Sequence, residues 1–486
     1  MDKVYQLFGR REIFTDETEI TAANVVDVLN DALLTHNFNQ NEINYLYWYL
    51  RGNQPILYRD NEKEQDVRAE ANNKVVVNRA FEIHSYWTDF VGGKPVQYVA
   101  RDAKENLAEK LQKLNDYIFA VKMNATNKTL FSWMFLAGVG YRIVLPNERR
   151  DRDRKPFVTY ALDPRYTFVV RNSGLGHLPV MGVQIVKQKD GQTIYSVYTD
   201  RYYFEIVDGK ITKQGVHTLG EIPIIEYPLN DWRLGIFEVV LPMLDAINMV
   251  SSNRNDAIAK FVQALLVFKN VDFEKDDLQS AKEDGAIGLP ADADVKYLVE
   301  QLHQMDTQAL VDDMYQTVLT ICSMPNRNNG NGGTSDNGVA VLFRDGFVTS
   351  EARAQGFETF YKDADQDALA LILYICDTLT DLGLTASQVD IRFTRRNEAN
   401  TSQKVDVLLK LLSNDNIHPV QAFTLCDLFP DPESAYLKGQ EYKAEQERKE
   451  MEELKKFTEH DHVKTGADEE DGNNVSENGQ SDRAAE

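Results

Sequence analysis

The sequence has few cysteines and no signal for export or membrane insertion. Its 486 residues include three cysteines, Cys322, Cys376 and Cys426, which are far apart in apolar surroundings. That usage is typical of reduced core thiols in a cytosolic protein and excludes a disulfide framework. Residues 1–3 continue into a polar, charged segment, so we expect no signal peptide. No apolar run reaches the roughly 20 residues that a membrane span needs.

Basic residues are scarce relative to acidic ones. The chain carries 53 lysines and arginines against 76 aspartates and glutamates, which gives a formal net charge of −23 and a pI near 4.9. Simple nucleic-acid binding uses a basic face, and this balance argues against it. It does not exclude DNA that passes without adhering, because like charges suppress adhesion. The length fits roughly two to four domains.

Motifs of catalysis and metal binding are missing. The sequence contains no GxSxG, HExxH or complete phosphate-binding loop, and Gly92–Lys94 lacks the spaced glycines of one. Glu459–His462 offers only a weak set of metal ligands beside a polar tail. Asp312–Asp313 and Asp363–Asp367 fall on predicted helix surfaces, where we expect them to be solvated. We therefore predict no catalytic residue, no metal site and no cofactor.

One long apolar stripe organises the rest of the chain. Within 237–270, apolar side chains recur at steps of three and four, which predicts one helix of roughly 45 Å. A polar block at 251–256 interrupts it. No other segment is an obvious partner along its full length, so we expect copies of the chain to pack there; the alternative is a core helix of a large monomer. The stripe consists of Leu244, Ile247, Ser251, Arg254, Ile258, Phe261, Leu265 and Phe268.

Around this stripe, helical and strand patterns alternate, which predicts the α+β fold class. Ahead of it we predict helices within 21–50, 79–91 and 104–137 and a strand at 72–78. Seven short strands, with a hairpin turn at Asp208–Gly209, then form an antiparallel module. These strands are 141–145, 157–162, 167–171, 180–188, 194–199, 202–207 and 210–214.

Beyond the stripe, a small α/β insert, with a helix at 276–283 and a strand at 295–299, is followed by a second amphipathic helix at 306–323. The two helices therefore form a long hairpin with the insert at its tip. Residues 326–338 contain no apolar side chain and are rich in Gly and Asn, which predicts a solvated loop; a disordered surface linker is the alternative. The elements that follow are a helix at 349–380, a strand at 389–394 and helices at 402–412, 418–428 and 434–457.

In this order the parts resemble the portal proteins of tailed bacteriophages, in particular the SPP1-like portal family, over roughly residues 20–460. The resemblance rests on five short stretches in a fixed order, together with the hairpin, the insert and the polar loop. They are Tyr49–Pro55, Asn72–Asn78, Gly92–Tyr98, Ile222–Tyr227 and Phe261–Phe268.

The resemblance implies a portal fold, with a wing, a stem helical hairpin, a clip α/β insert and a helical crown, assembled as a cyclic ring. Each part maps onto a range of this chain. The ranges are an N-terminal arm (1–20), the first part of the wing (21–235), stem helix 1 (236–268), the clip (269–305), stem helix 2 (306–324), the tunnel loop (325–338), the long helix with the second part of the wing (339–410), the crown (411–460) and a disordered acidic tail (461–486).

The resemblance also implies that the polar loop projects into a channel and touches DNA. The loop offers amide donors and acceptors and one cation, Arg327, for which we expect transient phosphate contacts. The DNA-contacting candidates are Asn326, Arg327, Asn328, Asn329, Asn331, Thr334, Ser335 and Asn337. The channel-facing candidates of the stem are Ser251, Arg254, Asn255 and Lys260.

By this resemblance the chain is a portal protein without catalysis of its own. It would form a ring, usually of twelve copies, at one capsid vertex of the virion, after assembly in the cytoplasm of a host bacterium. The implied partners are double-stranded DNA, the terminase large subunit, the major capsid and scaffolding proteins and head-completion adaptor proteins, with no membrane. Two alternatives stay open: a metal-dependent nucleic-acid-processing enzyme, and a low-order adaptor that its mass in solution would reveal.

Overall fold

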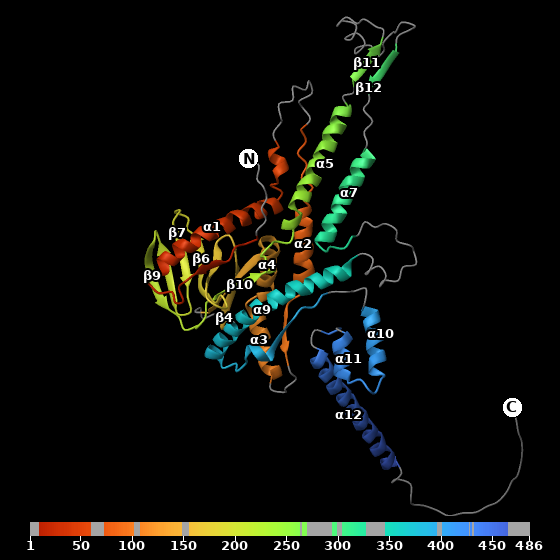
Figure 1. Cartoon of the computed structure of the whole chain (residues 1–486). Coiled ribbons are helices and arrows are strands. Elements are labelled where there is room, and N and C mark those ends of the chain that lie inside the picture. The colour runs from red at the N-terminus through yellow and green to blue at the C-terminus, as the bar shows by residue number, and fades with distance from the viewer. Residues whose placement is uncertain are drawn as a thin grey trace, which may run out of the picture. The chain divides into compact units, whose positions relative to one another are not determined.

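The computed structural model of the chain describes residues 9–59, 72–101, 107–147, 155–262, 265–269, 294–298, 304–326, 346–395, 401–426, 428–429 and 432–464. It combines helices with antiparallel sheets, so the predicted α+β class is confirmed (Figure 1). The chain divides into two compact units, Met1–Asn400 and Thr401–Glu486. All three cysteines are buried and free, in agreement with the prediction.

A six-stranded sheet in the first unit has the order β1-β5-β6-β7-β8-β9 and is antiparallel except at β1–β5. Alternate residues of β5 point to opposite faces: Phe168 and Val170 pack against helix α1 (Val25–Leu50), and Val169 faces a second cluster. The expected N-terminal arm is partly built into the sheet through β1. The strands are β1 (Ile13–Thr15), β5 (Thr167–Asn172), β6 (Pro179–Lys187), β7 (Thr193–Tyr198), β8 (Tyr202–Val207) and β9 (Lys210–Val216).

The main core of the first unit lies among helices and two smaller sheets, β10-β3-β4 and β13-β2. Its largest buried side chains include Trp87, Phe135 and Tyr361. The helical run predicted at 104–137 divides at Lys122, which has a positive φ. The elements are β2 (Gln97–Ala100), β3 (Val139–Pro146), β4 (Phe157–Leu162), β10 (Ile224–Pro228), β13 (Val389–Arg392), α2 (Arg79–Gly92), α3 (Ala108–Ala120), α4 (Met123–Ala137), α9 (Phe347–Thr380), and the 3-10 helices η1 (Pro55–Tyr58) and η4 (Ala386–Gln388).

The long apolar stripe forms two elements rather than one helix. A 3-10 turn, η3 (Glu238–Val240), leads into α5 (Leu241–Val262), and β11 (Leu265–Lys269) follows. The helix predicted over 236–268 is therefore wrong at its end, because 265–269 pair antiparallel with β12 (Asp294–Leu298). A continuous apolar run fits a buried strand as well as a helix, so periodicity alone misplaced this boundary.

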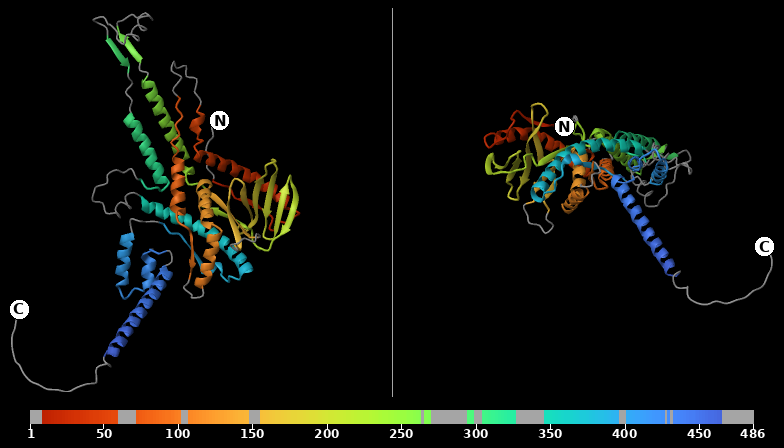
Figure 2. Two further views of the ribbon diagram at one scale, coloured as in Figure 1. Left: turned by 180° about the vertical axis from the view of Figure 1, so that it is seen from behind. Right: turned by 90° about the horizontal axis from the view of Figure 1, so that it is seen from below.

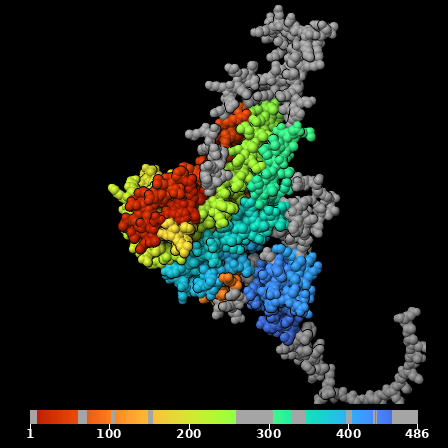
Figure 3. Space-filling model, in the orientation of Figure 1, coloured from red at the N-terminus to blue at the C-terminus, as the bar shows by residue number. Residues whose placement is uncertain are grey.

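α7 (Gln304–Ile321) returns beside α5, and the two helices pack along each other (Figures 1 and 2). The predicted pair of antiparallel helices is thus confirmed. In space-filling view α5, α7 and α9 make up one continuous stretch of surface (Figure 3). The helix expected within the insert, at 276–283, lies outside the described residues.

The second unit contains α10 (Thr401–Leu412), α11 (Pro419–Cys426) and α12 (Pro432–Lys464). Its buried apolar cluster consists of Leu408, Ala422 and Cys426, with partly buried neighbours around it. The unit begins at Thr401, whereas the resemblance places the start of the crown at residue 411. α12 continues to Lys464, and the remainder of the acidic tail lies outside the described residues.

Candidate functional site

The segment 72–78, predicted as a strand, joins no sheet and lies along α5 instead. Alternate backbone N–H groups of this segment donate to side chains that are four residues apart on the helix. Four helical residues rise about 6 Å and two extended residues about 6.7 Å, so the two spacings match. The pairs are Asn73 N–H with Asp256 Oδ1 at 2.7 Å, Val75 N–H with Ser252 Oγ at 3.0 Å, and Val77 N–H with Asn248 Oδ1 at 2.9 Å.

These three acceptors, Asn248, Ser252 and Asp256, are called the polar ladder below. All three are buried, although two of them belong to the polar block that interrupts the apolar stripe. No obvious partner along the full length of the stripe was visible in the sequence, yet on this side of α5 the segment 72–78 of the same chain is one. The spacing of the three acceptors was visible in the sequence, but the backbone groups that they bind were not.

Further hydrogen bonds fix α5 to the end of α1. The Tyr49 hydroxyl donates to Asp245 Oδ1 at 2.8 Å. Asn248 donates to the Gln54 side chain at 2.5 Å, and Gln54 donates to the Tyr49 carbonyl and to Asn78 Oδ1. Gln54 is only 1% exposed, so this network is buried between the elements that it joins. Polar contacts of this kind specify one register of α5 against α1.

The start of α5 is anchored by a buried carboxylate. Glu238 accepts hydrogen bonds from the Gly235 N–H and from Arg10 Nη2, both at 2.9 Å. Burial raises the pKa of Glu238 to about 7, against the opposing effect of the Arg10 charge. The segment ahead of β1 therefore helps to hold the base of the helical pair.

The predicted channel-facing residues lie on α5, between and beyond the three acceptors of the polar ladder. Ser251 is half-buried and Asn255 is exposed. Arg254 is half-buried and donates to Gln308 Oε1 of α7 at 2.5 Å, so it links the two helices. Lys260 lies in the last turn of α5, and its side chain lies outside the described part of the structure.

The end of α7 is tied to the start of α9. Ser350 donates to the Ser323 carbonyl at 2.6 Å, and Arg353 donates to the Ile321 carbonyl at 2.9 Å. The Trp87 indole donates to the Cys322 carbonyl at 3.1 Å, so the last carbonyls of the helix have partners. A Cβ added to Gly346 would lie 3.7 Å from the Pro325 Cα.

The chain therefore leaves this point after Asn326 and returns to it at Gly346. Asn326 is the one DNA-contacting candidate of the loop within the described structure. The other candidates lie outside the described residues: Arg327, Asn328, Asn329, Asn331, Thr334, Ser335 and Asn337. The contacts between the end of α7 and the start of α9 therefore fix the two ends of this segment.

One of the acidic residues expected to be solvated is buried. Asp365 of α9 is 1% exposed and accepts hydrogen bonds from Arg142 at 2.6 Å, Tyr98 at 2.7 Å and Tyr227 at 2.8 Å. Burial raises the pKa of both tyrosines well above their ordinary values, so they stay protonated donors. The surface prediction is wrong for Asp365, whereas Asp312, Asp313, Asp363 and Asp367 are exposed.

Two features of the described residues bear on other kinds of function. Within the described ranges, no group of three or more His, Cys, Asp or Glu side chains is placed to hold a metal ion. Among the helices in the described part of the chain, none has the length and apolar character to cross a membrane.

Comparison with known proteins gives one family match. Residues 31–461 match the family described as phage portal protein, SPP1 Gp6-like. The chain belongs to this phage portal family. The match spans most of both units, including α5, α7 and α9, and the family is structural rather than enzymatic. The family expected from the resemblance is thus confirmed.

No curated protein sequence matches this portal-family chain. Three solved structures of gene transfer agent (GTA) particles are similar to it. The neck of an empty particle, computed with C6 symmetry, gives 12% identity and a TM-score of 0.44, covering 72% of this chain and 90% of that one. The neck of a native particle, computed with C12 symmetry, gives 13% sequence identity and a TM-score of 0.38. The virion of a native particle gives 12% identity and a TM-score of 0.41. Each of these two matches covers 72% of this chain and 89% of the other chain.

Proposed function

We propose that the chain is the subunit of a portal ring of about twelve copies at one capsid vertex of a phage-like virion. The ring conducts double-stranded DNA during packaging and ejection and has no catalysis of its own. The terminase large subunit and, later, head-completion adaptor proteins dock on the clip, while the major capsid and scaffolding proteins hold the wing. Assembly takes place in the cytoplasm of a host bacterium. The observation that carries this proposal is the portal-family match over residues 31–461.

The geometry of the helical pair supports the assignment of parts. α5 and α7 serve as the stem, β11 and β12 belong to the clip between them, and 325–338 serve as the tunnel loop. The anchored junction at Ser323 and Ser350 suits a loop that must be held at its base while DNA moves past it. The wing corresponds to the other three sheets and α1–α4 with α9, and the crown to the second unit.

The charge of α7 supports the channel function. Its sequence contains three aspartates and no lysine, arginine or histidine. A ring of such helices repels a duplex and so lets it slide, because attractive phosphate contacts would hold it in place. Ser251, Arg254, Asn255 and Lys260 are proposed as the residues of α5 that add polar groups to the same channel.

The first test is the mass and symmetry of the purified protein, measured by light scattering and by imaging of single particles. A subunit of 55.4 kDa in a closed ring of about twelve gives roughly 650–700 kDa and an axial hole. A stable monomer or dimer, also in the presence of scaffolding and capsid proteins, would contradict the proposal. Metal-dependent cleavage of DNA by the purified chain would instead favour an enzyme.

A further inference from the structure

An aromatic and basic surface lies where α1 ends. Trp48, Tyr58 and Phe81 are 51%, 69% and 57% exposed, which is high for such large side chains. Arg51 lies over the rings of Tyr47 and Trp48, and the Lys74 ammonium donates to the Leu57 carbonyl at 2.9 Å. The aromatic-basic surface is defined here by its exposed members, Trp48, Arg51, Tyr58, Lys74 and Phe81.

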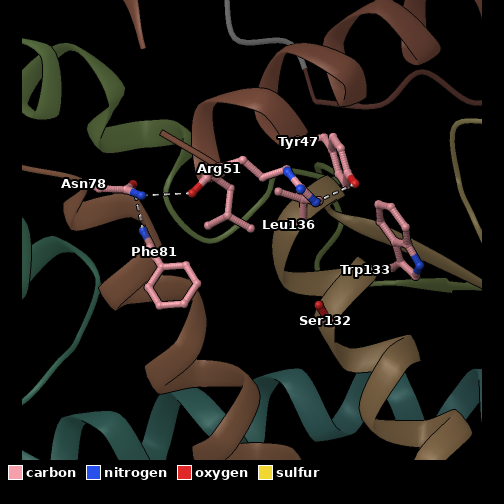
Figure 4. Close-up of a pocket in the computed structure, with 8 residues that line it drawn as sticks. Tyr47, Arg51, Asn78, Phe81, Ser132, Trp133 and Leu136 are labelled. Carbon is pink, nitrogen blue, oxygen red and sulfur yellow. Dashed lines mark hydrogen bonds between the residues drawn. The ribbon is translucent and has the colours of Figure 1, made fainter. Parts of the chain in front are cut away.

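Two hollows flank Phe81 on this surface. One, of about 650 Å³, is lined by Tyr47, Leu50, Trp133 and Leu136 together with Arg51 (Figure 4). The other, of about 670 Å³, lies between α2 and the end of α7, and Phe81 lines it as well. Exposed Trp, Tyr and Arg side chains beside such hollows are the residues that dominate the binding energy of protein interfaces.

The two cations of this surface have no acidic partner among the described residues. Arg51 and Lys74 are exposed, and neither forms an ion pair with a described residue. Nearby Arg59 and Arg79, by contrast, are paired with Asp256 and Glu82. Two exposed cations without an acidic partner among the described residues, in a chain of net charge −23, are complemented by an acidic patch.

The same chain offers an acidic surface in the right place. Asp312 and Asp313 of α7 are exposed, and neither forms an ion pair with a described residue. α7 lies on one side of α5, and the end of α1 with η1 lies on the other (Figures 1 and 2). The aromatic-basic surface and the two aspartates of α7 are thus two different, complementary patches of one subunit, which is what a head-to-tail contact between copies joins.

We propose that the aromatic-basic surface binds a second copy of this chain, whose α7 presents Asp312 and Asp313 to Arg51 and Lys74. The contact is heterologous, and it rests on the ring of the proposed function. Trp48 and Phe81 supply apolar area around the charges, and Asp312 and Asp313 set the register between neighbouring copies.

Charge reversal tests the contact in the full-length protein. Arg51→Glu with Lys74→Glu is expected to raise the concentration for half-maximal ring assembly at least tenfold by light scattering, and so is Asp312→Lys with Asp313→Lys. The four substitutions together are expected to restore assembly, since each charge again meets its opposite. Lys189→Glu with Lys210→Glu, which changes two exposed lysines elsewhere, is the matched control and should assemble normally.

Two neutral variants guard against misfolding as the cause. Trp48→Ala and Phe81→Ala are expected to weaken assembly about tenfold each. Trp232→Ala, at a tryptophan that is 71% exposed elsewhere, should not. Circular dichroism and the Tm of each variant establish that it is folded.

The outcomes separate the contact from the ring itself. Normal assembly of folded Arg51→Glu/Lys74→Glu protein would overturn the contact and leave the ring intact. Loss of assembly in both reversed pairs, without recovery when they are combined, would overturn the pairing with α7. Wild-type protein that forms no ring under any condition would remove the proposed function and this contact together.

Discussion

At the scale of single residues, Asp365 joins parts of the chain that are far apart in sequence. Arg142 comes from β3, Tyr98 from β2 and Tyr227 from β10, and all three donate to this one carboxylate of α9. We expect Asp365→Asn to lower the free energy of unfolding by about 3–5 kcal/mol, because Arg142 would stay buried without a counter-charge. Urea denaturation at pH 7.5 measures the loss.

Asp363→Asn on the same helix is the control for that experiment. Its side chain is exposed, so we expect a change within about 0.5 kcal/mol. Equal unfolding midpoints for the two variants would show that the buried network adds nothing to stability. The sequence shows three alternating aspartates and gives no sign that one of them is buried, because its partners lie 138 to 267 positions away.

His36 makes the stability of the first unit depend on pH. Its ring is stacked on Phe168 at 4.4 Å, and burial lowers its pKa to about 4 although a contact with the Arg165 carbonyl opposes the shift. The folded state therefore disfavours the proton that the unfolded chain binds near pH 6.5. This contribution to stability is complete above about pH 6.5 and is lost as the pH falls towards 4.

Between pH 8 and pH 5 the loss from His36 should be about 2 kcal/mol. The variant His36→Gln keeps a donor for the Arg165 carbonyl but cannot gain a charge. We therefore expect its free energy of unfolding to fall by about 2 kcal/mol less than that of the wild type between pH 8 and pH 5. Urea midpoints at the two pH values for both proteins measure the difference. The same pH dependence in both would mean that His36 does not titrate in this range.

At the scale of elements, the polar ladder can be tested with neighbouring serines. Ser252→Ala removes the acceptor of the Val75 N–H and leaves that group buried, so we expect a cost of about 1–3 kcal/mol in the free energy of unfolding. Ser251→Ala, one position earlier in the same helix, changes a half-buried hydroxyl, and we expect almost no cost. Similar losses from both variants would count against the ladder.

The ladder also shows which parts of the fold a sequence pattern can predict. α2, α7 and α9 and the strands β5 to β9 of the six-stranded sheet follow from period and turn residues, and the structure has them within a few positions, whereas β1 was expected to belong to an N-terminal arm. Residues 72–78 have the composition of a strand, yet their N–H groups bind side chains of α5. The β-propensity of a segment indicates that its backbone is extended, but tertiary contacts decide whether it joins a sheet.

The junction of α7 with α9 gives a second prediction at this scale. Arg353→Met removes donors to the Ile321 carbonyl and to Ser323 Oγ, which lies 3.2 Å away. We expect amide hydrogen exchange in residues 322–326 to become roughly tenfold faster, because local opening there costs less. Gln355→Met, on the exposed side of α9, serves as control and should leave these amides unchanged. Unchanged exchange in Arg353→Met would show that other contacts hold the junction.

At the scale of the whole molecule, the acidic composition constrains how the proposed ring can handle DNA. About twelve copies of a chain with net charge −23 repel a duplex at long range, so any attraction must come from a few local cations. Within the tunnel loop, residues 325–338, the sequence supplies one such cation, Arg327. Its place in the ring could be proposed from composition and family alone, since it lies outside the described residues.

Arg327 thus tests whether the proposed channel touches DNA electrostatically. We expect Arg327→Ala to reduce the amount of DNA packaged at low salt and the defect to shrink as salt rises, because screening removes the phosphate contact from the wild type too. Arg327→Lys keeps the charge and should package nearly as well as wild type. The measurement is nuclease-protected DNA per particle at several salt concentrations, with ring mass verified for each variant. A defect of the same size at every salt concentration would assign Arg327 a role in the shape of the loop instead.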